Sequence, residues 1–356
     1  MQQIGKVSVN AAPEQRDPAP LWVPSEERRA RANLTHYAGW LAEHRGVEVI
    51  KYDYPALWQW SVDNLEDCYA SIWDYFDIQS DTGYERVLGR AEMPEAEWFP
   101  GARLNYAEHI FRGKGGESLA VQFASEERKL DSWTWGELRS QAGAIAARLR
   151  AAGVGFGDRV AAYLPNIPEA LAAGLACMSL GAIWSACSPD FGVRSVVDRF
   201  AQIEPTVLFA VDGYRYGGKA FSRLAEVRAL QRSLPTVGQT VMLRYLDTDA
   251  DVSGLRNTVL WEDFKELGVV LSFERVPGEH PLWIVYSSGT TGLPKPIVHS
   301  HVGLLIDQIK YVNFHLDAQP GDRMFWFTTT GWVWFPPNRG GFPYAASRSG
   351  PRCSRS

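Results

Sequence analysis

Apolar positions recur with two different periods along the chain. Between residues 31 and 78 they follow helical spacing, with Leu34, Tyr37 and Leu41 on one face. From residue 118 onward, short apolar runs alternate with longer amphipathic segments. The runs predict strands at 119–123, 128–133, 159–164, 182–185, 206–211, 239–243 and 282–287, and the amphipathic segments predict helices at 135–151, 166–180, 193–203, 219–233 and 300–314.

This alternation predicts the fold class. Strands joined by helices form βαβ units around a mostly parallel sheet, so we expect an α/β domain preceded by a helical region. Segment 135–151 is the clearest helix, because its apolar residues share one stripe and Gly153 follows its end. The stripe consists of Leu138, Ala142, Ile145, Ala146 and Leu149.

Composition divides the chain into four parts. Residues 1–30 carry prolines among charges and predict a flexible arm, residues 31–117 form the helical region, and residues 118–333 form the α/β domain. Residues 334–356 contain no Leu, Ile, Val, Asp, Glu or Lys. Such a segment cannot fill a core, so we expect a disordered tail.

Bulk composition narrows the class of protein. The chain has 356 residues, 46% of them hydrophobic and 22% charged, which is typical of globular domains. A net charge of −5 argues against nucleic-acid binding, which needs an excess of clustered Lys and Arg. Neither a signal peptide nor a membrane-spanning run of ~18 apolar residues is visible. The four cysteines lack metal-ligand spacing, so we expect reduced thiols, no metal site built by the protein and a cytoplasmic location.

A loop rich in hydroxyls and glycines follows the last predicted strand. It runs from Ser287 through Gly289 and Gly292 to Lys295. Backbone N–H groups and hydroxyls in such a loop can surround phosphate oxygens, and the lysine adds a charge. A plain turn is the alternative. The Walker pattern does not apply, because Pro296 rather than Ser or Thr follows the lysine.

The loop resembles the phosphate loop of acyl-adenylate-forming enzymes. Three other segments narrow the resemblance to the acetoacetyl-CoA synthetases of that superfamily: Trp98 to Glu108, Gly181 to Gly192, and Asp212 to Lys219. The residues from Pro294 to His299 also fit, and the resemblance extends from about residue 30 to Val333. It implies an incomplete AMP-binding (adenylation) domain after the N-terminal extension of acyl-CoA synthetases.

The resemblance implies a two-step ligation. Acetoacetate and ATP, with Mg²⁺, would give acetoacetyl-adenylate and diphosphate, and coenzyme A as co-substrate would then release AMP and form acetoacetyl-CoA. The first step needs charge neutralisation on the transferred phosphates. The partners implied are these small molecules, with no nucleic acid and no membrane insertion, and the sequence carries no signal for an oligomeric state.

The same resemblance assigns residues. Those that would bind the ATP phosphates are Ser287, Ser288, Gly289, Thr290, Thr291, Gly292 and Lys295, with Lys295 also catalytic. Ser188 and Asp190 would border the coenzyme A channel, and Arg215 or Lys219 would meet its 3′-phosphate unless they form a solvated surface. Those expected near the acyl substrate are Thr330, Gly331 and Trp332, although Trp332 alternatively only packs.

The resemblance ends near Val333. The segments that bind adenine and ribose in this family, and its C-terminal domain, do not follow. We therefore expect a truncation or frameshift near residues 333–336 and a chain that is inactive by itself. Two alternatives stay open: a non-catalytic nucleotide-binding or interaction module, and a ligase for another short-chain acid.

Overall fold

The computed structural model describes residues 20–48, 53–93, 95–287, 292–325 and 328–329, together with strand residues 344–346. The helices are α1 (Glu26–Ala30), α2 (Asn33–Arg45), α3 (Tyr54–Asp63), α4 (Leu65–Tyr75), α5 (Tyr106–Phe111), α6 (Trp135–Ala151), α7 (Pro168–Ser179), α8 (Val193–Phe200), α9 (Leu224–Ser233) and α10 (His301–Lys310). The strands are β1 (Arg103–Leu104), β2 (Leu119–Phe123), β3 (Asp131–Thr134), β4 (Arg159–Tyr163), β5 (Ile183–Cys187), β6 (Val207–Val211), β7 (Gly213–Tyr216), β8 (Lys219–Ser222), β9 (Gln239–Leu243), β10 (Thr258–Leu260), β11 (Val276–Pro277), β12 (Pro281–Ser287), β13 (Lys295–Ser300), β14 (Met324–Phe325) and β15 (Tyr344–Ala346).

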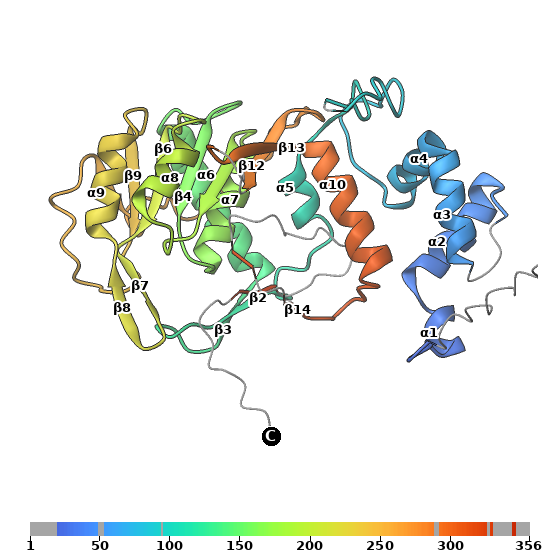
Figure 1. The fold of residues 1–356 in the computed structure, drawn as a ribbon, viewed down its shortest axis with the longest axis horizontal. Helices are drawn as coiled ribbons and strands as arrows, with labels where there is room; N and C mark the ends of the chain where they lie inside the picture. The colour runs from blue at the N-terminus through green and yellow to red at the C-terminus, as the bar shows by residue number, and fades with distance from the viewer. Residues whose placement is uncertain are drawn as a thin grey trace, which may run out of the picture.

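A seven-stranded sheet forms the centre of the α/β part (Figure 1). Its strand order is β10-β9-β6-β4-β5-β12-β13, and every neighbouring pair is parallel except β12 and β13. β4, β5 and β6 carry almost uninterrupted apolar runs because helices cover both faces of a parallel sheet. The α/β fold class predicted from the sequence is confirmed.

The two faces of the sheet carry different helices. Val160 and Ala162 of β4 pack in the core cluster that contains the buried stripe of α6 and the residues of α7. Ala161 and Tyr163, which alternate with them, pack in a second cluster with Val196 of α8 and with residues of α9. The alternation of side chains along each strand therefore produces three layers, helices on sheet on helices.

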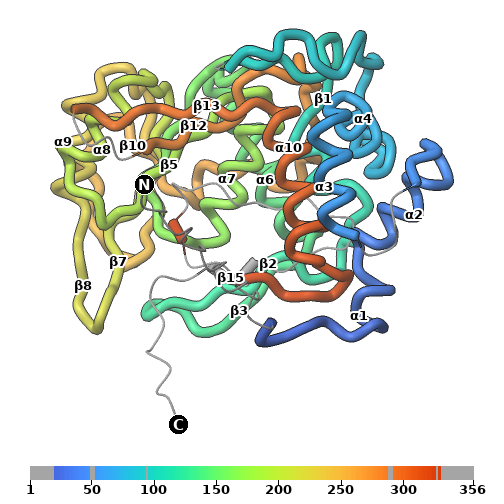
Figure 2. Tube along the Cα trace, turned by 45° about the vertical axis from the view of Figure 1, so that its right-hand side comes forward, coloured from blue at the N-terminus to red at the C-terminus, as the bar shows by residue number. Residues whose placement is uncertain are grey.

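The N-terminal helices pack against the C-terminal end of α10, which Lys310 closes (Figure 2). α10 continues into a π-helical turn, Tyr311–His315, where the sequence predicted one α-helix over 300–314. The Phe314 ring stacks on Tyr37 of α2 with 4.5 Å between centroids, and the Asn33 amide donates to the Asn313 and Ala318 carbonyls. Helices α2 to α4 thus share a core with the segment that follows the phosphate loop.

One predicted helix was wrong, and one strand was not predicted. Residues 219–233 are not one helix, because Lys219–Ser222 forms β8, which pairs with β7 across a turn at Gly217 and Gly218. Both glycines have positive φ (60° and 75°), which other residues rarely adopt. Lys295–Ser300, where the sequence predicted no strand, is the edge strand β13. An edge position tolerates Pro296, which lacks a backbone N–H.

Several other expectations can be compared with the structure. Tyr344–Ala346, inside the segment expected to be disordered, forms a strand beside β2, because backbone pairing with a strand needs no apolar side chain. The rest of 334–356 lies outside the described residues. Cys68, Cys177 and Cys187 are buried free thiols, as predicted, and Cys353 lies outside the described part. No helix among the described residues is long and apolar enough to cross a membrane.

Candidate functional site

The loops that carry the expected site residues leave one edge of the central sheet. β4, β5, β6, β9 and β12 run parallel, so their carboxyl ends share an edge, which we call the carboxyl edge. Ser188 and Asp190 follow β5, and Arg215 and Lys219 lie on the β7–β8 hairpin that follows β6 and projects beyond the sheet (Figures 1 and 2). The phosphate-loop residues follow β12. Open α/β sheets bind ligands at this edge, so the fold gathers the candidate residues where a ligand is expected.

β12 and β13 hold the two ends of the phosphate loop side by side. Ser287, the last residue of β12, is the register partner of Lys295, the first residue of β13. Gly292 has a φ of 112°, a positive value that residues other than glycine rarely adopt. The Lys295 side chain is exposed, and no described carboxylate forms a salt bridge with it. The loop residues outside the described part are Ser288, Gly289, Thr290 and Thr291.

The C-terminal end of α8 is tied to both strands of this pair. Gln202 Nε2 donates to the Pro294 carbonyl at 3.0 Å, one residue before Lys295. The Tyr286 hydroxyl near the end of β12 donates to the Arg199 carbonyl at 2.9 Å. These two hydrogen bonds fix the direction in which the chain enters and leaves the loop.

The loop after β5 is held by buried groups beneath it. The Tyr163 hydroxyl lies 2.8 Å from the carbonyl oxygens of both Pro189 and Phe191. Burial raises the pKa of Tyr163 well above its usual value, so this hydroxyl keeps the proton that it donates. Arg223 Nε donates to the same Pro189 carbonyl at 2.6 Å. Within the loop, Ser188 is buried and Asp190 is exposed.

Arg199 joins the loop after β5 to the end of β12. Its guanidinium carbon lies 5.1 Å from the centre of the Phe191 ring and 5.8 Å from the centre of the Tyr286 ring. Both distances are within the range of cation–π attraction. The Arg199 side chain therefore contacts both β12, which leads into the phosphate loop, and the Ser188–Phe191 loop.

The β7–β8 hairpin is fixed by two glutamates. Arg215 Nε donates to Glu127 at 2.5 Å, so Arg215 is not a purely solvated residue. The Glu126 carboxylate accepts hydrogen bonds from the backbone N–H groups of Gly217 and Gly218, both at 2.7 Å. Lys219 is exposed at the start of β8. Of the two basic residues singled out from the sequence, Lys219 faces solvent and Arg215 already has an anionic partner.

Thr328 and Thr329 are the described residues that directly precede the segment expected near the acyl substrate. Thr329 is buried, and the Thr328 carbonyl accepts a hydrogen bond from the Asn166 amide at 2.5 Å. Asn166 lies in the loop between β4 and α7. The contact therefore places Thr328 beside the loop that follows β4, at the carboxyl edge. Thr330, Gly331 and Trp332 lie outside the described residues.

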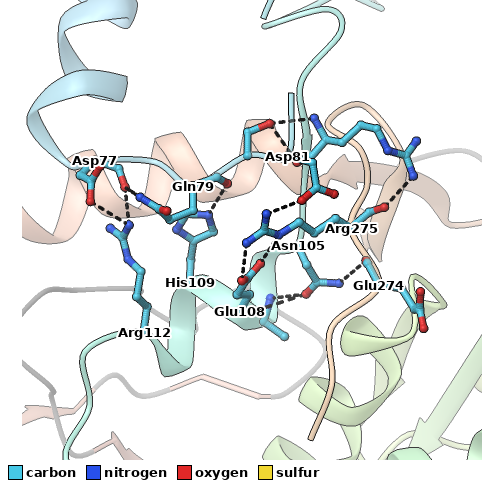
Figure 3. Close-up of polar contacts among 12 residues, drawn as sticks. Asp77, Gln79, Asp81, Asn105, Glu108, His109, Arg112, Glu274 and Arg275 are labelled. Carbon is cyan, nitrogen blue, oxygen red and sulfur yellow. Dashed lines mark hydrogen bonds and ion pairs between the residues drawn. The ribbon is translucent and has the colours of Figure 1, made fainter. Parts of the chain in front are cut away.

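Another segment that resembles the family, Trp98 to Glu108, lies away from the carboxyl edge, next to the end of α7 that precedes β5. Figure 3 shows the polar contacts of Asn105, Glu108 and Arg275. The buried Asn105 amide donates to the Met178 and Glu274 carbonyls at 2.9 and 2.8 Å, and its oxygen accepts from Ala107 N at the start of α5. Arg275 forms two hydrogen bonds with Glu108, at 2.8 and 2.7 Å. We call this cluster the Asn105 seam. Its polar groups join the N-terminal region to the α/β part and face no ligand-binding edge.

Two histidines in or beside the Asn105 seam are buried. His109 Nε2 lies 3.2 Å from the Gln79 carbonyl, and burial lowers the pKa of His109 to about 4. His301 Nδ1 accepts from Tyr106 N at 3.1 Å, and burial lowers the pKa of His301 to about 3. Both imidazoles are therefore neutral at pH 7 and serve as structural groups.

Comparison with known proteins identifies the family. Residues 112–335 match the family described as "AMP-binding enzyme", and residues 54–110 match "Acetyl-coenzyme A synthetase N-terminus". The first match covers the whole carboxyl edge. The chain belongs to the AMP-binding enzyme family.

Within the AMP-binding family, the chain is a homologue of acetoacetyl-CoA synthetases. It is 41% identical over 318 residues to the acetoacetyl-coenzyme A synthetase of Rhizobium meliloti, which covers 88% of this chain and 48% of that protein. The fold is similar to that of acetoacetyl-CoA synthetase from Streptomyces lividans, with a TM-score of 0.86 and 45% identity over 92% of this chain and 51% of that one. A malonamoyl-CoA synthetase from Penicillium aethiopicum is 37% identical over 295 residues, 79% of this chain and 41% of that protein. The chain spans about half the length of the curated relatives that it matches.

The sequence motifs of this AMP-binding chain did not predict which residues hold the loops at the carboxyl edge in place. Tyr163, Arg199, Gln202 and Arg223 all bond to segments of the carboxyl edge, yet each lies within or beside a helix or strand. Their targets are mostly main-chain carbonyls, which every residue has. No pattern in the sequence could therefore have paired them with their loops.

Proposed function

We propose that this chain supplies the nucleotide- and coenzyme A-facing half of an acetoacetate–CoA ligase. ATP and acetoacetate would form acetoacetyl-adenylate and diphosphate, and coenzyme A would then displace AMP. The observation that carries the proposal is the position of the 287–295 loop, whose two ends are paired at the carboxyl edge of a parallel sheet with Lys295 exposed.

Each group has a role in the proposed chemistry. Lys295 would neutralise charge on the diphosphate leaving group, with Ser287 and the other hydroxyls of the loop as hydrogen-bond donors. The loop at Ser188 and Asp190 and the hairpin residues Arg215 and Lys219 would border coenzyme A, and Thr330, Gly331 and Trp332 would border the acyl group. Arg215 would reach the 3′-phosphate only with the guanidinium N–H groups that Glu127 leaves free.

Mg²⁺ enters the proposal as a companion of the nucleotide phosphates. Protein-bound Mg²⁺ usually keeps several waters and takes one or two carboxylates in addition to phosphate oxygens. Among the described residues, no three His, Cys, Asp or Glu side chains gather as a metal site. The metal ion would screen the negative charge of the phosphates.

A fused enzyme tests the proposal. Residues 1–333 of this chain would be joined to the corresponding second half of the Streptomyces lividans synthetase, and AMP release would be followed with ATP, Mg²⁺ and coenzyme A. We expect release that depends on acetoacetate. A fusion that is folded but inactive with every acid, while the intact Streptomyces enzyme is active under the same conditions, would reject the proposal.

A ligase for another short acid is the second candidate, favoured by the 37% identity to a malonamoyl-CoA synthetase. The same fusion would be offered acetoacetate, malonamate, acetate and 3-hydroxybutyrate. A kcat/KM at least about 10-fold higher for malonamate, equivalent to 1.4 kcal/mol, would favour this candidate.

A further inference from the structure

We propose that Arg223 is a positioning residue that couples the Ser188–Phe191 loop to the β7–β8 hairpin and so sets the spacing of the coenzyme A site. The inference rests on the proposed function, because these two segments are the ones assigned to coenzyme A. Arg223 lies between β8 and α9, outside every motif that resembles the family.

One guanidinium contacts both segments. Arg223 Nε donates to the Pro189 carbonyl at 2.6 Å, and Nη2 donates to the Tyr214 hydroxyl of β7 at 3.1 Å. Its carbon lies 5.1 Å from the centre of the Tyr214 ring and 5.8 Å from that of Phe221 in β8. These two rings stack on each other at 5.3 Å, so Arg223 packs on the cross-strand pair that makes the hairpin rigid.

Other groups hold the guanidinium in this position. Arg223 Nη1 donates to Glu226 in the first turn of α9 and to the Ser222 carbonyl, both at 3.0 Å. The Arg223 side chain is 15% exposed, which limits screening by water. A lysine could not reproduce this set, because stacking and several directed N–H bonds require a planar guanidinium.

The Pro189 carbonyl is the point where the coupling reaches the loop. It accepts from Arg223, and it shares the single proton of the Tyr163 hydroxyl with the Phe191 carbonyl, because that hydroxyl lies 2.8 Å from both oxygens. Tyr163 is fully buried in the sheet and cannot follow a moving hairpin. Removal of the Arg223 bond should leave the loop anchored to the sheet but free of the hairpin.

Loss of the Arg223 contacts should affect coenzyme A binding selectively. The proposed coenzyme A-binding segments would lose their fixed spacing, whereas the ends of the phosphate loop keep the β12–β13 pairing and the hydrogen bonds of Gln202 and Tyr286, none of which involves Arg223. Arg223→Ala should therefore weaken coenzyme A binding and leave nucleotide binding unchanged. A residue that only stabilised the fold would affect both ligands.

The test uses the 356-residue chain and isothermal titration with coenzyme A and with ATP. The variants are Arg223→Ala, Arg223→Lys and the control Arg228→Ala, which changes an exposed arginine of α9. We expect the coenzyme A Kd to rise at least about 10-fold in both Arg223 variants, because lysine lacks the planar guanidinium and its directed N–H groups. In the control, the coenzyme A Kd should stay within about 2-fold of the parent value. ATP affinity should be unchanged in all three.

Amide hydrogen exchange of residues 188–192 and 213–222 gives a second readout that does not depend on a ligand. Both segments should exchange faster in the Arg223 variants and not in the control. Unchanged exchange, unchanged coenzyme A affinity, an equal loss for both ligands, or ATP binding without coenzyme A binding in the parent would each overturn the inference. A parent chain that binds neither ligand would also overturn the inference, whereas the proposed function is tested separately by the fused enzyme.

Discussion

The Asn105 seam and the carboxyl edge both contain segments that resemble the same family, yet the structure uses them differently. At the seam, polar side chains are buried or have polar partners, as in the bonds from Asn105 to two main-chain carbonyls and from Arg275 to Glu108. At the carboxyl edge, Lys295 and Lys219 are exposed, and no described carboxylate forms a salt bridge with either. A distinctive motif therefore marks either packing or chemistry, and the satisfaction of its polar groups distinguishes the two.

The largest expected effect is on stability at the seam. Asn105→Ala removes the N-cap of α5 and the amide that donates to the Met178 and Glu274 carbonyls, which should lower the free energy of unfolding by roughly 3–5 kcal/mol. Urea denaturation measures it. The matched control is Asn64→Ala, an exposed N-cap of α4 without a capping bond, expected to cost less than about 1 kcal/mol. Equal losses in the two variants would contradict the contrast between seam and surface.

The second effect should appear in activity and not in stability. In the fused enzyme, Lys295→Ala should raise the barrier to adenylate formation by roughly 2–4 kcal/mol, because one positive charge beside the leaving diphosphate is lost. Acetoacetate-dependent exchange of labelled diphosphate into ATP measures this step. Lys219→Ala is the control, since exchange does not involve coenzyme A. Parental exchange in Lys295→Ala, or a clear drop in its unfolding midpoint, would break the assignment.

Acid should weaken the seam by a smaller amount. The pKa of His109 is about 4 in the folded chain and ordinarily 6.5, so protons bind more strongly to the unfolded state. The stability from neutral His109 is present above pH 6.5 and is lost as the pH falls toward 4, with about 2 kcal/mol lost between pH 7 and pH 5.

Urea denaturation at pH 7, 6 and 5 compares the parent with His109→Gln, which keeps a donor for the Gln79 carbonyl. The variant should lose less stability over this range, because its side chain does not titrate. Parallel pH profiles would show that His109 does not bind protons differently in the two states.

The smallest effect concerns Gln202. Gln202→Ala removes one exposed hydrogen bond to Pro294, so stability should change by less than about 1 kcal/mol. Diphosphate exchange in the fused enzyme should slow by no more than about 10-fold, because the backbone pairing of β12 and β13 still holds the loop. Gln59→Ala, on the exposed surface of α3, should change neither quantity. A larger loss in Gln202→Ala than in Lys295→Ala would reverse the proposed order of the two residues.

The sequence by itself determined the elements with strong periodicity and the family. The α6 stripe and the mostly apolar strands β4 and β6 follow directly from residue spacing, because burial on one or two faces dictates which positions are apolar. The phosphate-loop motif also followed, since glycine and hydroxyl residues are needed there for backbone and side-chain reasons. The same reasoning missed the β7–β8 hairpin, because short, half-exposed strands carry little periodic signal.

Only the tertiary structure decided which polar residues work together. Asn105 and Glu274 are 169 positions apart, and Arg223 reaches a carbonyl 34 positions away, so neither pair has a signature in local sequence. It also decided that β13 is a sheet edge and that Arg215 is engaged with Glu127. Hydrogen bonds to main-chain carbonyls depend on where the chain passes in space, and the chain path is fixed by packing of the whole sheet and its helices.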